Sequence, residues 1–297
     1  MYSTFPHLQS IANFRDVGAF INAETSTQPV RLNTSLLFRG ARPDEASTQD
    51  RRRLVEEYGV RSIIDLRTKT EHIEQAQKWD AKIRSSAALF QSNEEAAEPL
   101  KIPGITYHEI NFNGSAFSRM LISKLSWWEF SKLMALMAFG YRLEGIRVLA
   151  PHLEAMGLEG LAIESLEACK YEVKQIFDVL SQEEKWPIMI HCTQGKDRTG
   201  LVIMLILFLL GVDSGAVEAD YLLSGPELEP EKAERMKEIS STGLSEHFTT
   251  CPPDLVAKVN KHLHQKYGGV DRYLLEAQVT TQMQENVREI LLKRANV

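Results

Sequence analysis

The sequence is poor in cysteine, with only three in 297 residues. Secreted domains built on disulfides need a dense and even set of cysteines, so this sequence does not fit that class. The low, odd number instead indicates a reducing compartment, and we expect a cytoplasmic protein. A thiol that acts as a nucleophile would need such a compartment.

Long apolar runs and a surplus of positive charge are also missing. The run Leu201–Leu210 is apolar throughout but falls far short of the about 20 residues that a membrane-crossing helix needs. The start of the chain, Met1–Pro6, has no basic region followed by an apolar stretch, so we expect no secretory signal. The net charge of −6 does not support a nucleic-acid surface, although a small basic pocket remains compatible with it.

The histidines show no spacing typical of a metal site. His262 and His264 are two positions apart and would point to different faces of a helix. Surface or packing roles explain such residues better than metal binding, so we predict neither a metal nor a cofactor.

The most informative stretch runs from Ile188 to Gly200. Apolar residues from Trp186 to Ile190 predict a short buried strand, and Leu201–Leu210 predicts a buried helix. A polar loop joins the two. Free N–H groups and the positive end of the helix dipole meet at such a junction, which therefore suits an anion.

Two side chains would turn this anion cradle into a reactive site. Cys192 opens the loop, and Arg198 follows six positions later. The amides between them can point at one phosphoryl group, while the guanidinium binds two of its oxygens and the thiolate attacks in line. A buried structural cysteine is the alternative, but a structural turn has no need of Lys196, Asp197 and Arg198 in one loop.

A resemblance to known enzymes rests on the run HCxxGKDRTG, from His191 to Gly200. It resembles the signature of the atypical tyrosine or dual-specificity branch, found in bacteria and fungi, of the cysteine-dependent protein tyrosine phosphatase superfamily. Similar blocks are NFRD from Asn13, FRG from Phe38, DLRxxxE from Asp65 and DYxxS from Asp220. The resemblance covers most of the chain and implies an α/β fold with a central, mostly parallel sheet flanked by helices. We expect residues 1–297 to form a single phosphatase domain.

Local patterns predict the remaining elements. We expect an edge strand and turn at Asn13–Gly18 and strands at Leu36–Gly40, Val60–Leu66 and Ile105–Phe112. Helices are predicted at Pro43–Tyr58, Leu158–Leu180, Ala216–Leu223, Pro230–Ser240, Pro253–Tyr267 and Val279–Lys293. The segment Ser85–Pro103 shows little periodicity and is predicted to be a loop, and Tyr267–Val270 a turn.

Residues 114–157 form a predicted helical insertion with breaks near Gly140, Pro151 and Gly157. Apolar residues recur there at helical spacing. In the related phosphatases a helical lid covers the active site at the comparable place, so the resemblance favours a lid. Plain core packing explains such apolar stripes equally well, and both alternatives stay open.

The loop residues have separable expected roles. A free thiol has a pKa of about 8.5, and the loop amides, the helix N-terminus and Arg198 all favour its charged form at Cys192. His191 would orient the loop rather than act as a base. Thr199 would donate its hydroxyl to the sulfur and help it leave. The other phosphate-binding positions are Thr193, Gln194, Gly195 and Lys196.

The acid that protonates the leaving group is less clear. Trp186-Pro187 is followed by Ile188, so no aspartate occupies a separate acid loop there. The resemblance suggests Asp197, and a brace within the loop is the alternative role.

Charged residues around the predicted loop have two possible uses. The resemblance suggests that Asp65, at the end of a strand, contacts Lys196, and a salt bridge that only fixes the loop is the alternative. Lys196 would add positive charge at the pocket mouth, where it suits a second phosphate. Arg39 would either face the pocket or form a structural ion pair.

We predict a phosphatase that acts on phosphotyrosine, and on phosphoserine or phosphothreonine as a wider range, through a phosphocysteine intermediate. A phosphoinositide phosphatase on the same scaffold, with transient contact to a membrane surface, is the first alternative. Because no upstream acid is evident, a catalytically poor phosphate-binding adaptor is the alternative from another class.

Overall fold

The computed structural model describes residues 8–25, 30–88 and 100–293. Within these residues one sheet is formed by β1 (Arg15–Asp16), β2 (Leu37–Gly40), β3 (Ser62–Asp65), β4 (Thr106–Glu109) and β5 (Ile188–His191). The order across the sheet is β1-β2-β5-β3-β4, with β1 antiparallel to β2 and the other neighbours parallel. The predicted α/β fold with a central, mostly parallel sheet is confirmed.

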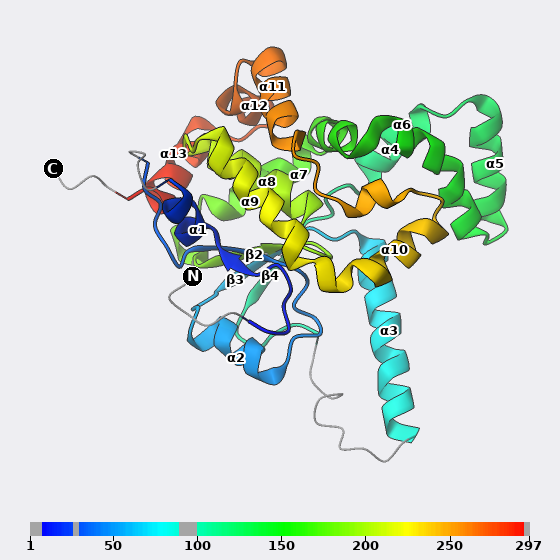
Figure 1. The fold of residues 1–297 in the computed structure, drawn as a ribbon, viewed down its shortest axis with the longest axis horizontal. Helices are drawn as coiled ribbons and strands as arrows, with labels where there is room; N and C mark the ends of the chain where they lie inside the picture. The colour runs from blue at the N-terminus through cyan, green and yellow to red at the C-terminus, as the bar shows by residue number, and fades with distance from the viewer. Residues whose placement is uncertain (1–7, 26–29, 89–99, 294–297) are drawn as a thin grey trace.

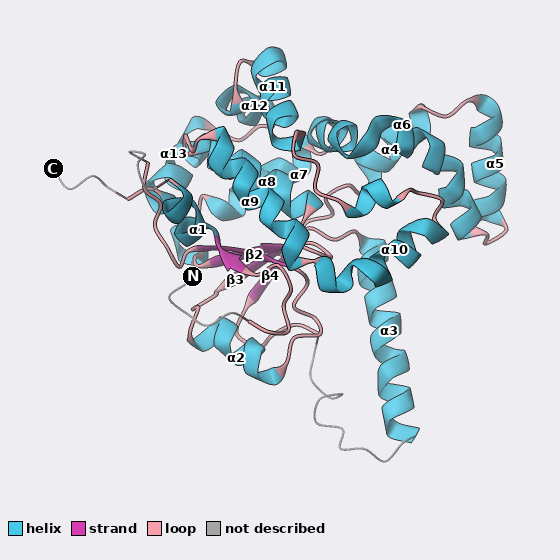
Figure 2. Ribbon diagram, in the orientation of Figure 1, coloured by secondary structure: helices cyan, strands magenta, loops and turns pink. Residues whose placement is uncertain are grey.

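Helices cover both faces of this sheet (Figure 1). The helices in chain order are α1 (Val17–Glu24), α2 (Thr48–Glu56), α3 (Lys69–Ala88), α4 (Ser115–Ser123), α5 (Trp127–Ala138), α6 (Arg142–Ala168), α7 (Lys170–Leu180), α8 (Asp197–Leu209), α9 (Ser214–Glu227), α10 (Lys232–Ser241), α11 (Leu255–Tyr267), α12 (Val270–Glu276) and α13 (Thr281–Leu291). Figure 2 shows α2 on one side of the strands and α1, α8 and α9 on the other.

The two faces are buried in separate apolar clusters because side chains alternate along each strand. On β5, Ile188 and Ile190 belong to the larger cluster, which includes α8, whereas Met189 belongs to the smaller one beside α2. After its polar first turn, helix α8 is apolar on every side from Leu201 to Leu209, as expected for a helix surrounded by the core. The central strand and the helix that follows it are therefore fixed from every side.

The ends of three parallel strands meet at one edge of the sheet. Gly40 of β2 and Asp65 of β3 are both in register with His191 of β5. Open α/β sheets bind ligands beyond the carboxyl ends of their strands. The residues that follow β5 therefore lie where a ligand site is expected.

Two predictions, one at the start of the chain and one just after the insertion, are wrong. The strand predicted at Asn13–Gly18 is only β1, because Asp16 caps α1 by accepting a hydrogen bond from Ala19 N (3.0 Å). The predicted helix Leu158–Leu180 is divided at Cys169, where the helical geometry is lost. The Cys169 thiol there contacts Asn113, a partner far away in sequence that local periodicity does not reveal.

Three further predictions need correction or lie partly outside the described residues. Pro151 does not break α6, whereas Gly157 does, with φ of 62°. The loop predicted at Ser85–Pro103 begins inside α3, which runs to Ala88, and residues 89–99 lie outside the described ranges. Helix α12, which no prediction included, begins at Val270, the last residue of the turn predicted at Tyr267–Val270.

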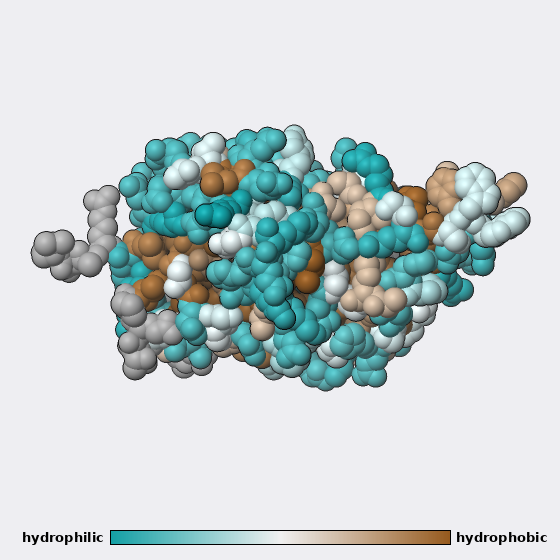
Figure 3. All heavy atoms as spheres, turned by 90° about the horizontal axis from the view of Figure 1, so that it is seen from above, coloured by the Kyte–Doolittle hydropathy of each residue, from teal (hydrophilic) through white to brown (hydrophobic). Residues whose placement is uncertain are grey.

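The helical insertion projects from the body and carries an exposed apolar face. On α5, Leu133 is buried, but Trp127 is 74% and Trp128 82% exposed. Figure 3 shows pale and brown residues at the end of the molecule that carries this helix. Core packing therefore does not account for this face of α5, and the lid stays a prediction.

Candidate active site

The loop between β5 and α8 begins with Cys192, which is buried. Helix α8 starts at Asp197, so the loop ends at a helix N-terminus as predicted. Gly195 has a φ of +67°, and a Cβ there would lie 2.1 Å from Gly40 O. The loop can approach β2 this closely only because Gly195 has no side chain.

Side chains behind the loop hold its carbonyl groups. Asn13 Nδ2 donates to Gln194 O and to Gly195 O (3.1 Å each), and Arg39 Nη2 donates to Gly195 O (2.6 Å). In a planar trans peptide the next N–H points away from the carbonyl. The amides of Gly195 and Lys196 therefore face away from these donors, in the orientation that an anion cradle requires.

A buried ion cluster supports these donors. Asp220 on α9 pairs with Arg15 (Nε to Oδ1, 2.7 Å) and with Arg39 Nη1. Burial alone would raise the pKa of the Asp220 carboxyl, but the charges of the two arginines outweigh it and hold the pKa below its usual range. Arg39 thus forms the structural ion pair that was one of its two predicted roles, and it does not face the pocket.

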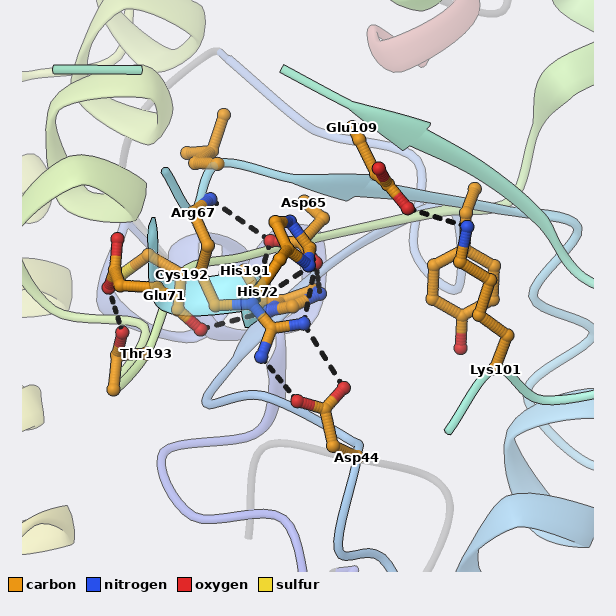
Figure 4. Close-up of polar contacts among 12 residues, drawn as sticks. Asp44, Asp65, Arg67, Glu71, His72, Lys101, Glu109, His191, Cys192 and Thr193 are labelled. Atoms are coloured by element: carbon orange, nitrogen blue, oxygen red, sulfur yellow. Dashed lines mark hydrogen bonds and ion pairs between the residues drawn. The ribbon is translucent and has the colours of Figure 1, made fainter. Parts of the chain in front are cut away.

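Arg198 is held from the front of the loop by Glu71 on α3. Its Nη1 and Nη2 donate to the two carboxylate oxygens of Glu71 (2.7 Å each), and the Thr193 hydroxyl donates to Glu71 Oε1 (2.5 Å). Figure 4 shows Glu71 between Thr193 and the ion network at the end of β3. Burial raises the pKa of Glu71, but the hydrogen bonds and charge of Arg198 lower it well below the usual range. The sequence marked Glu71 only as part of DLRxxxE.

The predicted contact between Asp65 and Lys196 is wrong. Asp65 instead binds Arg67 (Nη2 to Oδ2, 2.7 Å), which also pairs with Asp44, as Figure 4 shows. Burial raises the pKa of Asp65, but the charges of His191 and Arg67 and hydrogen bonds from Arg67 lower it to about 2. Asp65 is therefore a buried structural partner at the strand end.

Lys196 does not reach the pocket mouth, which corrects a second prediction. It is buried, and its Nζ donates to Thr250 O (2.6 Å) and lies 3.3 Å from Asp197 Oδ1. The pattern of the loop gives the residue type but not the direction of its side chain, and here that side chain turns toward the segment after α10. Lys196 ties the loop to that segment.

His191 makes a contact that agrees with its expected role, whereas Thr199 does not. The fully buried ring of His191 hydrogen-bonds Cys192 O through Nδ1 (2.9 Å), and burial lowers its pKa. This geometry agrees with an orienting role. The hydrogen bond expected from Thr199 to the sulfur is not formed: Thr199 Oγ1 has no partner among the described residues.

The front of the loop opens into a charged cavity of about 460 Å³. Thr193 and Gln194 line it beside Glu71. The rest of this charged cavity is lined by both basic and acidic side chains, namely Arg42, Arg67, Lys78 and Arg235 with Glu45, Glu74 and Glu231. Asp197, half-exposed at the first turn of α8, lines a different cavity together with Arg198.

Neither a metal cluster nor a membrane-crossing helix was found in residues 8–25, 30–88 and 100–293. No group of three or more His, Cys, Asp or Glu side chains there could hold a metal ion. No helix in the same ranges has the length and apolar character needed to span a bilayer.

Comparisons with known proteins agree with this geometry. The family model described as "Tyrosine phosphatase family" matches residues 6–293. Triple specificity protein phosphatase PtpB of Mycobacterium tuberculosis is 28% identical over 121 residues, which cover 36% of this chain and 44% of that protein. A tyrosine-protein phosphatase of Nostoc commune is 28% identical over 120 residues, 37% of this chain and 41% of that protein.

The match thus spans less than half the length of these curated relatives, whereas the family model covers nearly the whole chain. The strand, loop and helix that carry Cys192 and Arg198 lie inside the matched range. The chain belongs to the tyrosine phosphatase family.

Proposed function

We propose that this protein hydrolyses phosphotyrosine in proteins, with phosphoserine and phosphothreonine as wider targets, through a phosphocysteine intermediate. The observation that carries the proposal is the placement of Cys192 and Arg198 at the two ends of one loop, between β5 and α8, whose carbonyls are held by side chains behind it. Positioning and charge stabilisation are the main requirements of phosphoryl transfer, and this loop supplies both.

In the first step the Cys192 thiolate attacks phosphorus. The S–P bond forms as the P–O bond to the substrate breaks, and the leaving oxygen takes a proton from Asp197. The loop amides and Arg198 bind the equatorial oxygens, where charge is spread in the transition state. Asp197 fits this role because it is half-exposed beside Arg198.

In the second step water attacks phosphorus and the S–P bond breaks. Asp197, now a carboxylate, takes the proton of that water, and the thiolate and inorganic phosphate are released. His191 keeps Cys192 in place through the carbonyl contact described above.

Hydrolysis of para-nitrophenyl phosphate tests the proposal. Cys192→Ser should abolish turnover, whereas Cys251→Ser, which changes a half-buried free thiol, should not. Acid quenching of the wild type during turnover should trap phosphate on Cys192, detected by mass spectrometry. Turnover by Cys192→Ser would refute the enzyme assignment. Tight phosphate binding by the wild type without any turnover would support the adaptor alternative.

A phosphoinositide substrate is the second candidate, because Arg42 and Lys78 line the charged cavity in front of the loop. Since Lys196 is buried, these two residues rather than Lys196 would bind a second phosphate. Acidic side chains share the cavity, so a protein substrate remains our first choice. Arg42→Ala should slow phosphoinositide turnover more than phosphopeptide turnover if the lipid is the substrate.

A further inference from the structure

A second cavity, of about 250 Å³, adjoins the loop beside Asp197 and Arg198. We call it the apolar cavity, because most of its lining comes from apolar side chains of α4, of α6 and of the segments around α10 and α11. Phe117 on α4, Leu153 and Leu158 on α6, and Phe248 are among them. Ligand pockets usually combine such walls with a few polar groups.

Tyr221 on α9 brings an unexplained polar atom to the apolar cavity. The residue is 1% exposed, and its Oη has no hydrogen-bond partner among the described residues. Its ring lies against Gly200, where an added Cβ would be 3.2 Å from Cδ2. A buried hydroxyl without a protein partner is costly, so one beside a cavity needs a partner from whatever fills that cavity, water or a ligand.

A second polar atom in the same cavity also lacks a hydrogen bond. Asp197 Oδ1 is buried and has no such partner in the described chain, although it lies 3.3 Å from Lys196 Nζ. Burial, and then the negative charge of Asp197, raise the pKa of Tyr221 well above its usual value. The phenol therefore stays protonated at neutral pH and has a hydrogen to donate to an acceptor.

The two cavities beside the loop suit different parts of a substrate. Placing an aromatic ring among the charged groups of the charged cavity would remove water from them at a cost. In the apolar cavity the same ring would gain about 25 cal/mol for each Å² of apolar surface buried. The apolar cavity also holds Asp197, which must reach the oxygen that leaves.

We propose that the apolar cavity binds the aryl leaving group of the substrate, with the Tyr221 hydroxyl donating a hydrogen bond to its oxygen. This rests on the proposed function and extends it to residues outside the loop. As the S–P bond forms and the P–O bond breaks, the phenolic oxygen takes the proton of Asp197. Tyr221 keeps its own proton and only stabilises the oxygen.

Two aryl substrates and one substrate without a ring test the proposal. The ratio of kcat/KM for 2-naphthyl phosphate to that for acetyl phosphate isolates binding of the ring. Ala162→Leu, which fills the apolar cavity from α6, should lower this ratio about tenfold. Ala155→Leu is the matched control, since Ala155 is exposed on the same helix and does not line the cavity. Equal ratios in both variants would overturn the proposal.

Tyr221→Phe keeps the ring against Gly200 and removes only the hydroxyl. The ratio of kcat/KM for phenyl phosphate to that for acetyl phosphate should fall about tenfold. The melting temperature should stay equal or rise, because an unsatisfied buried group is lost. An unchanged ratio would overturn the role of Tyr221 and leave the proposed function intact, since that function depends on Cys192. Direct binding of the product 2-naphthol to the free enzyme should be weakened by Ala162→Leu and not by Ala155→Leu, and equal binding to both variants would contradict the proposal.

Discussion

The two sides of the Cys192 loop are held by ion pairs that differ in exposure. Behind the loop, the side chains of Arg15, Arg39 and Asp220 are 6%, 0% and 2% exposed. In front, those of Arg198 and Glu71 are 16% and 27% exposed. A buried pair is expensive to break because the remaining charge has no water, whereas a pair that reaches solvent can open at small cost.

Because of this difference, the rear and the front ion pairs support the loop in different ways. The rear cluster fixes the backbone that forms the cradle and is shared with the core of the fold. Under the proposed function, the front pair holds a side chain that exchanges or shares its partners when a phosphate binds. We therefore expect rear changes to lower stability first and front changes to lower turnover first.

The largest effect is expected at Arg198, on the front side. Arg198→Lys should lower kcat/KM about 10³-fold or more, because an ammonium cannot bind two phosphate oxygens in a fork. The free energy of unfolding should change by no more than about 1 kcal/mol. Steady-state kinetics with para-nitrophenyl phosphate and urea unfolding measure the two quantities. A large loss of stability with little loss of turnover would contradict the expectation that changes on the front side lower turnover first.

Asp220→Asn should have the next largest effect and tests the rear side. It leaves two buried guanidinium groups without a counter-charge, so the free energy of unfolding should fall by about 3–5 kcal/mol. Asp213→Asn is the control, because Asp213 caps α9 and asparagine caps a helix equally well. Urea unfolding that gives the same midpoint for both variants would show that the rear cluster is not a structural support.

Glu71→Gln should lower kcat between about tenfold and a hundredfold, since Arg198 loses its charged partner and its fixed orientation. Stability should change by only about 1 kcal/mol or less, because the pair is partly exposed. Glu56→Gln, at an exposed carboxylate on α2, is the control. If Glu71→Gln unfolded the protein while turnover per folded molecule stayed normal, Glu71 would belong with the rear supports.

The smallest expected effect is the loss of fold stability in acid. The pKa of Asp65 is lowered to about 2, and that of Glu71 is lowered too. A carboxyl whose pKa is lowered by folding stabilises the protein above its unfolded pKa of about 4 and loses this contribution as the pH falls through the folded value. The Asp65 contribution, roughly 2 kcal/mol, should disappear between about pH 4 and pH 2. Asp65→Asn should be less stable at neutral pH and lose less on acidification, as measured by urea unfolding across this range.

The sequence was most informative where the signals are local. An apolar strand, a loop bounded by Cys192 and Arg198 and an apolar helix follow one another directly, and the structure has them in that order. Ser47 caps α2 and Gly59, with positive φ, follows its end, as local rules predict. These features depend on residues a few positions apart.

Long-range partners could not be predicted in the same way. Arg15 and Asp220 are 205 positions apart, and Glu71 and Arg198 are 127 apart. No pattern in the sequence says which of many charged residues will meet. The predicted direction of the Lys196 side chain was wrong for a related reason. Its partner is the main-chain carbonyl of Thr250, and every residue has such a carbonyl, so no sequence pattern identifies it. The division between α6 and α7 depends likewise on a distant contact, that of Cys169 with Asn113.

The close approach of Gly195 to the Gly40 carbonyl has a consequence for how this enzyme family can diversify. Two main-chain segments meet there, so any side chain at position 195 would push the loop away from β2. Variation is easier at the rim, where Thr193 and Gln194 face the charged cavity and side chains of α3 line the same cavity. New substrate preferences can arise there without disturbing the reaction centre, and libraries for directed evolution should keep both glycines unchanged.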